Sequence, residues 1–335
     1  MSQELTRDRL LLLGRNFMTP RILLTAAELD LFTKLKDNPR GIEDLCTAEG
    51  WDRRGLRILM DALAAQGLLI RGTDGKYGLP EPVRKYLVSD SEDSILPMIL
   101  HGCSLWKSWS HLTRIIKTGE NPNVTGRASR PAEEAAEETK DFIEAMDVVG
   151  RSMAPIIADS LDLSRYTRLL DVGGGPGTYT MAFLRKAPHM TATLFDLPNV
   201  VEIGKRRLTE NGFIDRVKVV AGDYNTDDLP AGHDLALLSA VIHSNSREEN
   251  RHLFRGTYRS LEPGGTILVR DHIMDPTRTF PVAGAIFAVN MLAATSGGDT
   301  YTFDEVREDL ESAGFKNVRM IRDGQDMDQL VAAEK

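Results

Sequence analysis

A run of glycines next to an acidic residue is the part of this chain whose composition and spacing point most directly to chemistry. The segment Leu169–Gly177 reads LLDVGGGPG, an apolar run that ends in Asp171 and passes directly into glycines. Glycine has no side chain, so the backbone of such a turn lets a ligand approach closely. We expect Asp171, Gly173 and Gly175 to contact a bound cofactor at this turn.

Two further acidic residues follow at the ends of the next two predicted strands. Asp196 in FDLPNV lies about 20 residues beyond the glycine turn, where a carboxylate can accept hydrogen bonds from both ribose hydroxyls. Asp223 in AGDY is placed to accept from an adenine amino group, and Leu197 and Tyr224 offer apolar or flat contacts. This order favours S-adenosylmethionine (SAM) as the cofactor, and we also assign Ser239, at the end of the following strand, to its site.

A dinucleotide site is the main alternative for the glycine turn. The fingerprint G-x-G-x-x-G needs a small sixth residue, and counting from Gly173 that position is Thr178. NAD is therefore the weaker interpretation. A doubly wound domain in which the acids bind nothing is a further one.

An α/β fold must position these residues. Apolar runs predict strands over 168–172, 192–196, 217–221, 235–239 and 266–271, with helical patterns between them. Such alternation indicates a Rossmann-like, mainly parallel sheet. A helix over 303–313 and strand-like runs over 318–322 and 329–332 then predict a closing antiparallel hairpin, which is typical of SAM-dependent methyltransferases rather than of dehydrogenases.

The N-terminal region has a different pattern, with helices and one short hairpin. Helical patterns span 5–17, 21–35, 42–49 and 53–66, and Asp74-Gly75 then lies between two short apolar runs. This order is that of a winged helix. DNA binding through Arg53, Arg54 and Arg57 is one interpretation, but acids and bases are about equally numerous here, which favours a packing or dimerisation module.

Length and charge fit a multidomain protein that acts on small molecules. We divide the 335 residues into a dimerisation domain (1–95), a helical connector that contributes to the substrate pocket (96–160) and a cofactor domain (161–335). The net charge of −8 opposes attraction to nucleic acid or anionic membranes. No apolar stretch is long enough for a signal or membrane helix, so we expect a cytoplasmic location. The two cysteines, Cys46 and Cys103, predict neither a disulfide framework nor a zinc site.

The motifs together resemble the small-molecule O-methyltransferases of the caffeic acid and acetylserotonin type, including bacterial tailoring members. The matching segments, in order from Thr19 to the C-terminus, are the winged helix, LLDVGGGPG, FDLPNV, GDY, AVIH, LEPGG and ESAGF. The resemblance implies a class I SAM-dependent enzyme. It also implies that the N-terminal domain builds an intertwined homodimer and helps to close the partner's active site.

His243 is the candidate general base. It ends the segment LALLSAVIH, interpreted as the fourth strand, at the carboxyl edge where open α/β sheets place their ligands. A phenol has a pKa of about 10, so an imidazole with a pKa of about 6.5 can take its proton as the oxygen attacks. His243 also matches the family's base, and Asp271, which ends the next strand, matches the acid that orients it. The alternatives are a merely polar strand-end histidine and a simple strand-end acid.

The chain departs from the plant members of this family at two places. Those enzymes have Asp-Trp after the base, where Ser244 and Asn245 stand here, and their second acid after the late Gly-Gly corresponds to Thr300. One consequence that we consider is that these changes hold the His243 side chain less rigidly than in the plant enzymes. The changes also put the acceptor in question, because some relatives methylate ring carbon and others have drifted toward decarboxylation or hydroxylation. We interpret them as subgroup differences.

An acceptor pocket follows from the same resemblance. Its candidate residues are Phe142 and Met146 on a helix expected over 137–149, Asn290, Met291 and Thr295 before the late glycines, and His101, Trp106 and Trp109 as a roof. Ordinary core packing is the competing interpretation for all of them. An apolar, aromatic pocket suits a planar phenol, polyketide or tetrapyrrole better than a sugar or an acid.

We therefore expect a homodimeric, SAM-dependent O-methyltransferase that acts on a hydroxyl, phenolic or otherwise aromatic, of a small molecule. Two alternatives remain. One is a C-methyltransferase that acts on a pigment or polyketide ring, of the bacteriochlorophyll type, and the other is a winged-helix transcriptional regulator with a small-molecule-binding domain. No metal is expected, because His243, His252 and His272 form no H-x-x-x-H pair.

Overall fold

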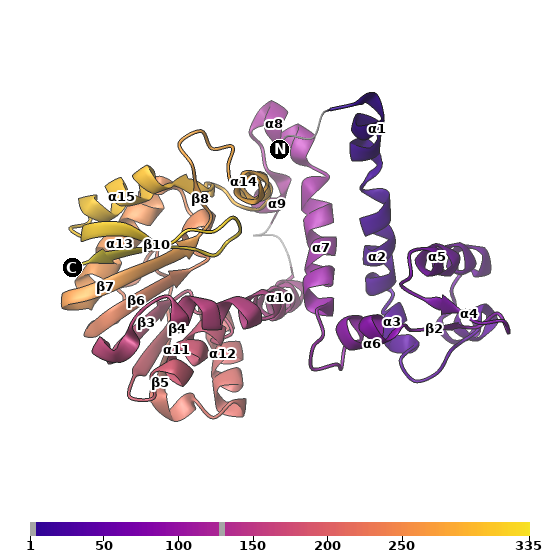
Figure 1. Cartoon of the computed structure of the whole chain (residues 1–335), viewed down its shortest axis with the longest axis horizontal. Helices are drawn as coiled ribbons and strands as arrows, with labels where there is room; N and C mark the ends of the chain where they lie inside the picture. Colours follow the sequence, from indigo (N-terminus) through magenta and orange to yellow (C-terminus); the bar gives the residue numbers. More distant parts are fainter. Residues whose placement is uncertain (1–4, 127–130) are drawn as a thin grey trace. The chain divides into compact units, whose positions relative to one another are not determined.

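The computed structural model of the chain describes residues 5–126 and 131–335 (Figure 1). The chain divides into two compact units, of which the first ends at Ser104 and the second runs from Leu105 to Lys335. The division falls within helix α7 (Leu96–Trp109). Most of the connector expected over 96–160 is therefore grouped with the second unit.

The first unit is helical and carries one small hairpin. Its elements are α1 (Arg7–Arg15), α2 (Met18–Glu28), α3 (Leu31–Lys34), α4 (Ile42–Glu49), α5 (Arg53–Ala65), β1 (Ile70–Arg71), β2 (Tyr77–Gly78) and α6 (Glu81–Leu87). Phe32, Leu45 and Met60 lie in its buried core. The antiparallel hairpin β1–β2 turns at the predicted Asp74-Gly75, where Gly75 has a φ of +77° that glycine adopts without strain.

One predicted helix of this unit is divided in two. The sequence predicts a continuous helix over 21–35, but α2 ends at Glu28 and α3 begins at Leu31. Asp30 between them has a φ of +49°, a left-handed conformation that aspartate tolerates better than most residues. The break lets Leu31 and Phe32 enter the core, so tertiary packing decides this boundary.

Two of the three arginines considered for DNA binding lie in ion pairs on α5. Arg53 pairs with Glu43 of α4, and Arg57 lies 3.0 Å from Asp61 one turn further along α5. Neutralised arginines attract a phosphate backbone weakly, so this surface supports the packing interpretation.

The second unit is built on a seven-stranded sheet (Figure 1). Its strands, in spatial order, are β10 (Lys316–Arg322), β11 (Gln329–Glu334), β7 (Leu261–Asp271), β6 (His233–Ser239), β3 (Arg168–Val172), β4 (Thr191–Asp196) and β5 (Val217–Ala221). β3 to β7 pair in parallel, whereas β11 is antiparallel to both β7 and β10. The predicted Rossmann-like sheet and its closing antiparallel hairpin are confirmed.

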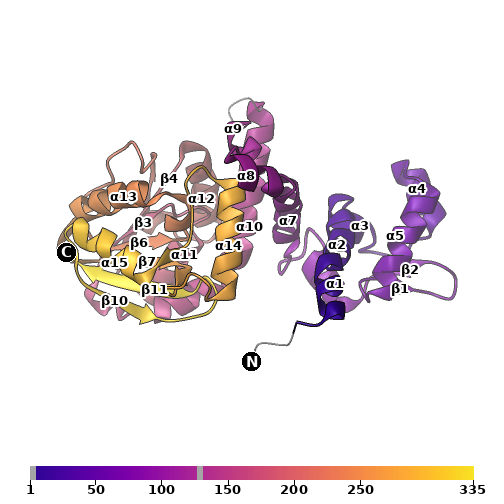
Figure 2. The ribbon, with the colours of Figure 1, turned by 90° about the horizontal axis from the view of Figure 1, so that it is seen from above.

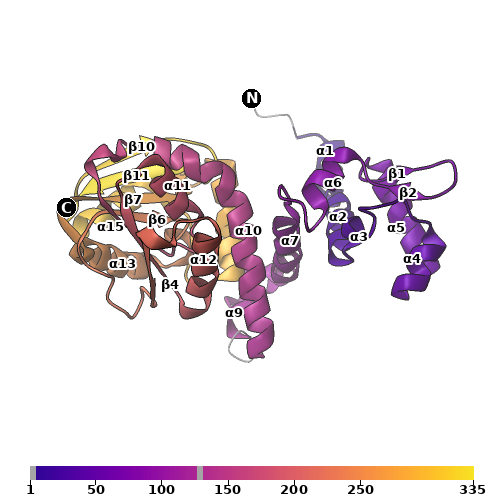
Figure 3. The same cartoon turned by 90° about the horizontal axis from the view of Figure 1, so that it is seen from below.

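Helices cover both faces of this sheet. One face packs against α10 (Ala132–Asp159), α11 (Thr178–Lys186) and α12 (Pro198–Glu210), which lie in front of the sheet in Figure 3. The other face packs against α13 (Arg247–Ser260) and α15 (Phe303–Ser312). Strands buried on both faces read as nearly continuous apolar runs, which is why the sequence predicts them well.

Helix α10 is twice as long as its sequence pattern predicts. The expected helix covers 137–149, but α10 continues through Pro155 to Asp159. Ala154, Ile157 and Ala158 are buried against the sheet core, and this packing offsets the hydrogen bond that proline removes. The buried Asp147 carboxylate also holds α10 in place, because it accepts from Thr178 Oγ1 and Arg207 Nη2, both at 2.6 Å.

Shorter elements complete the second unit. They are α8 (Leu112–Thr118), α9 (Pro122–Thr125), β8 (Ile273–Met274), α14 (Val282–Ala294), β9 (Tyr301–Thr302) and the 3-10 turns η2 (Leu163–Arg165), η3 (Ile214–Arg216) and η4 (Ile242–Ser244). The apolar helix α14 runs along one side of the unit in Figure 2 and contacts β8 and η4. Within 5–126 and 131–335, no helix is both long enough and apolar enough to cross a membrane.

Candidate active site

The glycine turn follows β3 and is closed by its neighbours. Gly173 N donates to Phe195 O of β4 at 2.8 Å, and Gly175 has a φ of +53°. A Cβ atom at Gly174 would lie 2.9 Å from Leu194 Cγ, which leaves no room for a side chain. The backbone therefore forms the surface of the turn, as the sequence predicts for a site that a ligand approaches closely.

Asp171 lies behind this turn. Its side chain is buried, and Oδ2 accepts a hydrogen bond from Thr180 Oγ1 at 2.5 Å. Burial raises the pKa of Asp171 to about 6, although the Thr180 hydrogen bond acts in the opposite direction. The carboxyl thus ties β3 to α11 and supports the turn from beneath.

Asp196 joins the end of β4 to the turn. Its Oδ2 accepts from Gly175 N and its Oδ1 from Leu197 N, each at 2.7 Å. Each carboxylate oxygen has two lone pairs, so each retains one for a further donor. Burial raises the pKa of Asp196, and the Leu197 side chain beside it is 43% exposed. This geometry suits a carboxylate that binds two adjacent hydroxyls.

Asp223 and Tyr224 come after β5 and differ in their environment. Asp223 Oδ1 accepts from Asn225 N at 2.9 Å within its own loop. Tyr224 donates its hydroxyl proton to Asn245 Oδ1 at 3.2 Å, and burial raises its pKa to about 12, so the hydroxyl stays protonated at neutral pH. Tyr224 therefore connects this loop to the segment that carries His243.

His243 lies beyond the strand that was expected to carry it. β6 ends at Ser239, Ala240 has a φ of +58°, and His243 lies on the 3-10 turn η4. The sharp turn after Ser239 ends the strand and brings the buried imidazole over the end of β7. The prediction that the strand continues to His243 was wrong, because an apolar run does not show where the backbone leaves the sheet.

His243 and Asp271 form a buried pair. His243 Nδ1 lies 2.8 and 3.0 Å from the two Asp271 oxygens, and His272 N also donates to Oδ1 at 2.8 Å. Burial alone would raise the pKa of Asp271, but attraction to His243 and these hydrogen bonds outweigh it, so the pKa lies below its usual value. An ionised carboxylate only accepts, so Nδ1 carries a proton.

Buried asparagines hold the turn beneath this pair. Asn250 Nδ2 donates to Ile242 O at 2.9 Å, and Asn245 Nδ2 donates to Asn250 Oδ1 at 3.1 Å. Tyr301 donates its hydroxyl proton to Asn245 O. Asn245 thus stabilises the turn by hydrogen bonds to Asn250 and Tyr301, and it also connects the turn to Tyr224.

Thr300, which the resemblance aligns with a second acid of the plant enzymes, carries no charge. Its side chain is buried, and Arg278 Nη1 donates to its carbonyl at 2.9 Å. The neighbouring Asp299 forms an ion pair with Arg278 at 3.1 Å, and its backbone N–H donates to His243 O at 3.0 Å. This segment therefore contacts His243 through its backbone.

The predicted acceptor residues fall into two groups. Phe142 on α10 is 45% exposed, Met146 is half-buried, and Asn290 on α14 accepts from Trp109 Nε1 at 2.9 Å. Met291 is buried, and Thr295 Oγ1 caps the end of α14 by donating to Met291 O and accepting from Gly298 N. Met291 and Thr295 form the second group, which packs in the interior and caps the end of α14.

The predicted roof is divided between the two units. Trp109 joins Asn290 in the second unit, and Trp106 is 38% exposed on α7. His101 belongs to the first unit, where burial lowers its pKa.

Two aromatic groups that lie near His243, Phe287 and His272, were not assigned to its site by the sequence analysis. The Phe287 ring on α14 meets the His243 ring edge-on, with centroids 4.8 Å apart, and lies 5.0 Å from the His272 ring. Burial lowers the pKa of His272, and its Nδ1 has no hydrogen-bond partner among the described residues. Phe287 lies one helical turn before Asn290, so helical spacing from that residue was the available signal.

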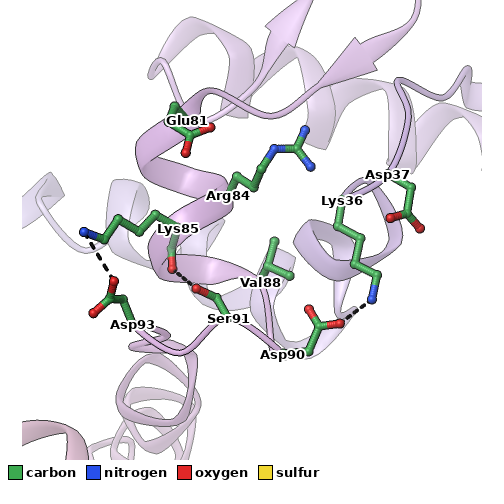
Figure 4. Close-up of a pocket in the computed structure, with 9 residues that line it drawn as sticks. All are labelled: Lys36, Asp37, Glu81, Arg84, Lys85, Val88, Asp90, Ser91 and Asp93. Atoms are coloured by element: carbon green, nitrogen blue, oxygen red, sulfur yellow. Dashed lines mark hydrogen bonds and ion pairs between the residues drawn. The ribbon is translucent and has the colours of Figure 1, made fainter.

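The hollow drawn in Figure 4 is formed by residues of the first unit alone. It has a volume of about 460 Å³ and is lined by Lys36, Asp37, Glu81, Arg84, Lys85, Val88, Asp90, Ser91 and Asp93. Lys36 pairs with Asp90 at 2.5 Å and Lys85 with Asp93 at 3.3 Å, as the dashed lines show. In the part of the chain that the structure describes, no three His, Cys, Asp or Glu side chains gather as metal ligands would.

Comparisons with known proteins agree with this geometry. The O-methyltransferase domain family matches residues 109–316, and the O-methyltransferase dimerisation domain family matches residues 11–89. The tetracenomycin polyketide synthesis 8-O-methyl transferase TcmO of Streptomyces glaucescens is 31% identical over 311 residues, which cover 90% of this chain and 89% of TcmO.

Two further proteins extend the comparison. The 3-hydroxy-5-methyl-1-naphthoate 3-O-methyltransferase of Streptomyces sahachiroi is 30% identical over 303 residues, which cover 90% of this chain and 87% of that enzyme. The crystal structure of human N-acetylserotonin methyltransferase in complex with SAM covers 100% of this chain and 99% of its own, with a TM-score of 0.85 at 27% identity. The glycine turn, Asp196 and the His243–Asp271 pair thus lie in a chain that belongs to the SAM-dependent O-methyltransferase family.

Proposed function

We propose that this enzyme methylates a phenolic hydroxyl of a small molecule and that His243 is its general base. The buried His243–Asp271 pair is the observation that carries the proposal. Because His243 Nδ1 keeps its proton and donates it as a hydrogen bond to the Asp271 carboxylate, Nε2 is the nitrogen that can accept another proton. An imidazole in this state removes a phenol proton near neutral pH.

The residues of this chain have complementary tasks in such a reaction. When bound, SAM supplies the methyl group on a sulfonium whose sulfur is a good leaving group. His243 Nε2 takes the proton of the acceptor hydroxyl as the oxygen gains the methyl group, and Asp271 stabilises the resulting imidazolium. The base is ready again when Nε2 loses this proton to water.

The cofactor-binding assignments fit the geometry of the strand ends. Asp196 has one lone pair left on each oxygen for the ribose hydroxyls, and Gly175 is fixed beside it by a hydrogen bond. Leu197 is exposed enough to cover a flat ring, and the Asp223 loop follows the next strand. We assign the ribose to Asp196 and the adenine to the surface between Leu197 and Asp223.

An aromatic acceptor is supported by the residues beside the base and by the relatives. Phe287 lies against the His243 ring, and Phe142 on α10 is 45% exposed. The Streptomyces relatives are named for O-methylation of a polyketide and of a hydroxynaphthoate. Aromatic walls stack on planar rings and offer little to a sugar.

Product analysis with a labelled methyl donor tests the proposal. The enzyme is incubated with ¹³C-methyl SAM and with matched pairs of acceptors, each a naphthol and an alkyl alcohol of similar size. The products are then examined by NMR. We expect a methoxy carbon from the phenols and none from the alkyl alcohols. A C-methyl signal would instead support ring-carbon methylation, and methylation of the alcohols alone would refute a phenolic acceptor.

We further propose that the first unit forms a homodimer with a second copy and that α4, α5 and the β1–β2 hairpin act there as a winged helix used for packing. The dimerisation family match covers this unit. None of the α1 residues is buried, and Leu10, Leu11, Leu12 and Leu13 are 45–67% exposed. Four adjacent exposed leucines are costly in water and are typical of a surface that another protein covers.

Light scattering on charge variants tests the dimer. Leu12→Glu with Leu13→Glu should convert the dimer to monomer, because a buried charge without a partner opposes association. Ile116→Glu on α8 is the matched control, since Ile116 is also 68% exposed but lies outside the matched domain. A wild-type monomer, or a double variant that stays dimeric, would contradict the proposal.

A further inference from the structure

Arg270 is a buried cation at the carboxyl edge of the sheet. It is the penultimate residue of β7, only 3% exposed, and lies in register between Ser239 of β6 and Leu330 of β11. Leu268, two residues earlier, packs in the core with α10 and α11, so Arg270 shares that face of the sheet.

The guanidinium of Arg270 has few protein partners. Nη1 donates to Ser239 Oγ at 3.3 Å, and the group lies over the Tyr179 ring at 5.2 Å. Nε is buried with no hydrogen-bond partner among the described residues, and Arg270 forms no ion pair with any of them. A buried charge without a counterion is strongly unfavourable, so a bound anion would stabilise the Arg270 guanidinium.

A second unpartnered polar group lies at the same place. The Tyr179 hydroxyl is buried close to the Ser239 side chain, but no described residue forms a hydrogen bond of normal geometry with it. Tyr179 is the second residue of α11, which begins directly after the glycine turn. Two unfilled donors and the Ser239 hydroxyl thus converge next to the turn that the cofactor approaches.

The order of the strands indicates which anion this is. Asp223 follows β5, Asp196 ends β4, the glycine turn follows β3, and Arg270 lies beyond β6 on β7. With adenine and ribose at the β5 and β4 end, the rest of SAM extends along the edge toward β6 and β7, and its far end carries a carboxylate. We propose that Arg270 binds this methionyl carboxylate, assisted by the hydroxyls of Ser239 and Tyr179.

Successive side chains of β7 point to opposite faces of the sheet, so Arg270 and Asp271 lie in two different parts of the site. Arg270 faces α11 and the cofactor, whereas Asp271 holds His243. An arginine matches a carboxylate with paired donors, which a serine at the neighbouring strand end cannot do alone. The inference rests on the proposed placement of adenine and ribose at Asp223 and Asp196, and not on the proposed acceptor or base.

Calorimetric binding of two ligands that differ only in the carboxylate tests the proposal. The ligands are S-adenosylhomocysteine (SAH) and its decarboxylated analogue, which keeps the adenosine, sulfur and amine. The wild-type protein should prefer SAH by roughly 10- to 100-fold, as expected for a charge-assisted pair. Arg270→Met should abolish this preference while binding the analogue nearly as the wild type does.

Matched variants separate recognition from folding. Arg168→Met removes an exposed arginine at the opposite end of β3 and should leave the preference unchanged. Tyr179→Phe removes only the hydroxyl and should lower the preference by a few fold, which keeps the proposal testable if Arg270→Met does not fold. An unchanged preference in Arg270→Met or Tyr179→Phe, or an equal loss for both ligands, would overturn it. Failure of the wild type to bind either ligand would instead contradict the cofactor assignment.

Discussion

The proposed cofactor edge and the proposed acceptor side of this enzyme are built in different ways. At the cofactor edge, Asp196 and Gly175 come from the ends of adjacent strands and are fixed to each other by a 2.7 Å hydrogen bond. On the acceptor side, Phe142 and Phe287 come from two helices, α10 and α14, and belong to segments more than 100 residues apart. The first region is formed mainly by backbone and short side chains, whereas the second is formed by large side chains on helix surfaces.

This difference indicates that side chains can vary more readily on the proposed acceptor side than at the proposed cofactor edge. Replacement of Gly174 would clash with Leu194, whereas the Phe142 side chain is 45% exposed. A family that keeps one cofactor and changes its acceptors needs such an arrangement. His243 lies between the two regions, on a turn held by Asn250 from one side and contacted by Phe287 from the other.

Removal of the base should have the largest effect and should separate the two regions cleanly. His243→Ala is expected to lower turnover by roughly 10²- to 10⁴-fold, because a positioned general base contributes that much. SAH affinity, measured by calorimetry, should remain nearly intact. The exposed His252→Ala on α13 is the control and should keep full activity. Normal turnover in His243→Ala would refute the role of the base.

Asp271→Asn should produce the next largest loss. The amide no longer stabilises the imidazolium and can favour the wrong imidazole tautomer, so we expect kcat to fall roughly 10- to 10³-fold. The KM for SAM should change little, since Asp271 contacts His243 and not the glycine turn. Steady-state kinetics with Asp228→Asn, an exposed acid, provides the comparison. A loss confined to KM for SAM would place Asp271 in the cofactor edge instead.

The buried Asp171 should show how the cofactor edge depends on pH. Its pKa of about 6 exceeds that of the unfolded chain, about 3.9, so the folded protein holds more protons between these values. The apo wild type should therefore lose stability as pH rises from about 4 to 6. Asp171→Asn removes this term, on the order of 2 to 3 kcal/mol, and should be stabilised relative to wild type at pH 7.

Denaturant unfolding at several pH values measures this effect. Thr180→Val removes a hydrogen bond that lowers the Asp171 pKa, so the pKa should rise and the loss of stability should continue to a higher pH than in the wild type. Identical pH profiles for wild type and Asp171→Asn would show that the carboxyl is not the source of the slope.

The smallest of these effects is expected on the acceptor side. Phe142→Ala should raise KM for an aromatic acceptor roughly tenfold through lost ring contact, with SAH affinity unchanged. Ile156→Ala, at a 41% exposed position further along α10, is the matched control. A change in SAH affinity without a change in acceptor KM would assign Phe142 to the cofactor and remove the contrast between the two regions.

The sequence predicted the cofactor edge in more detail than the acceptor side. Glycines, a strand-ending acid and the distance to the next acid are local signals, and the parallel sheet brings strand ends to one edge, as with Gly175 and Asp196. By contrast, Phe287 was missed and Thr295 proved to cap α14, because helical spacing alone does not show which face of a helix meets another segment. His243 was predicted as the base from its position after a strand and from a resemblance, although that strand was predicted to be too long.

The sequence by itself determined the order of strands and helices, the glycine turn and the acids that follow it, since these depend on backbone conformation and apolar periodicity. Only the tertiary structure decided that Asp271 reaches His243 across 28 residues and that Arg270, one residue earlier, is a buried cation facing α11. Burial and pairing between distant segments depend on how the sheet and helices pack. That environment sets the free-energy cost of a buried charge and the pKa of an ionisable group.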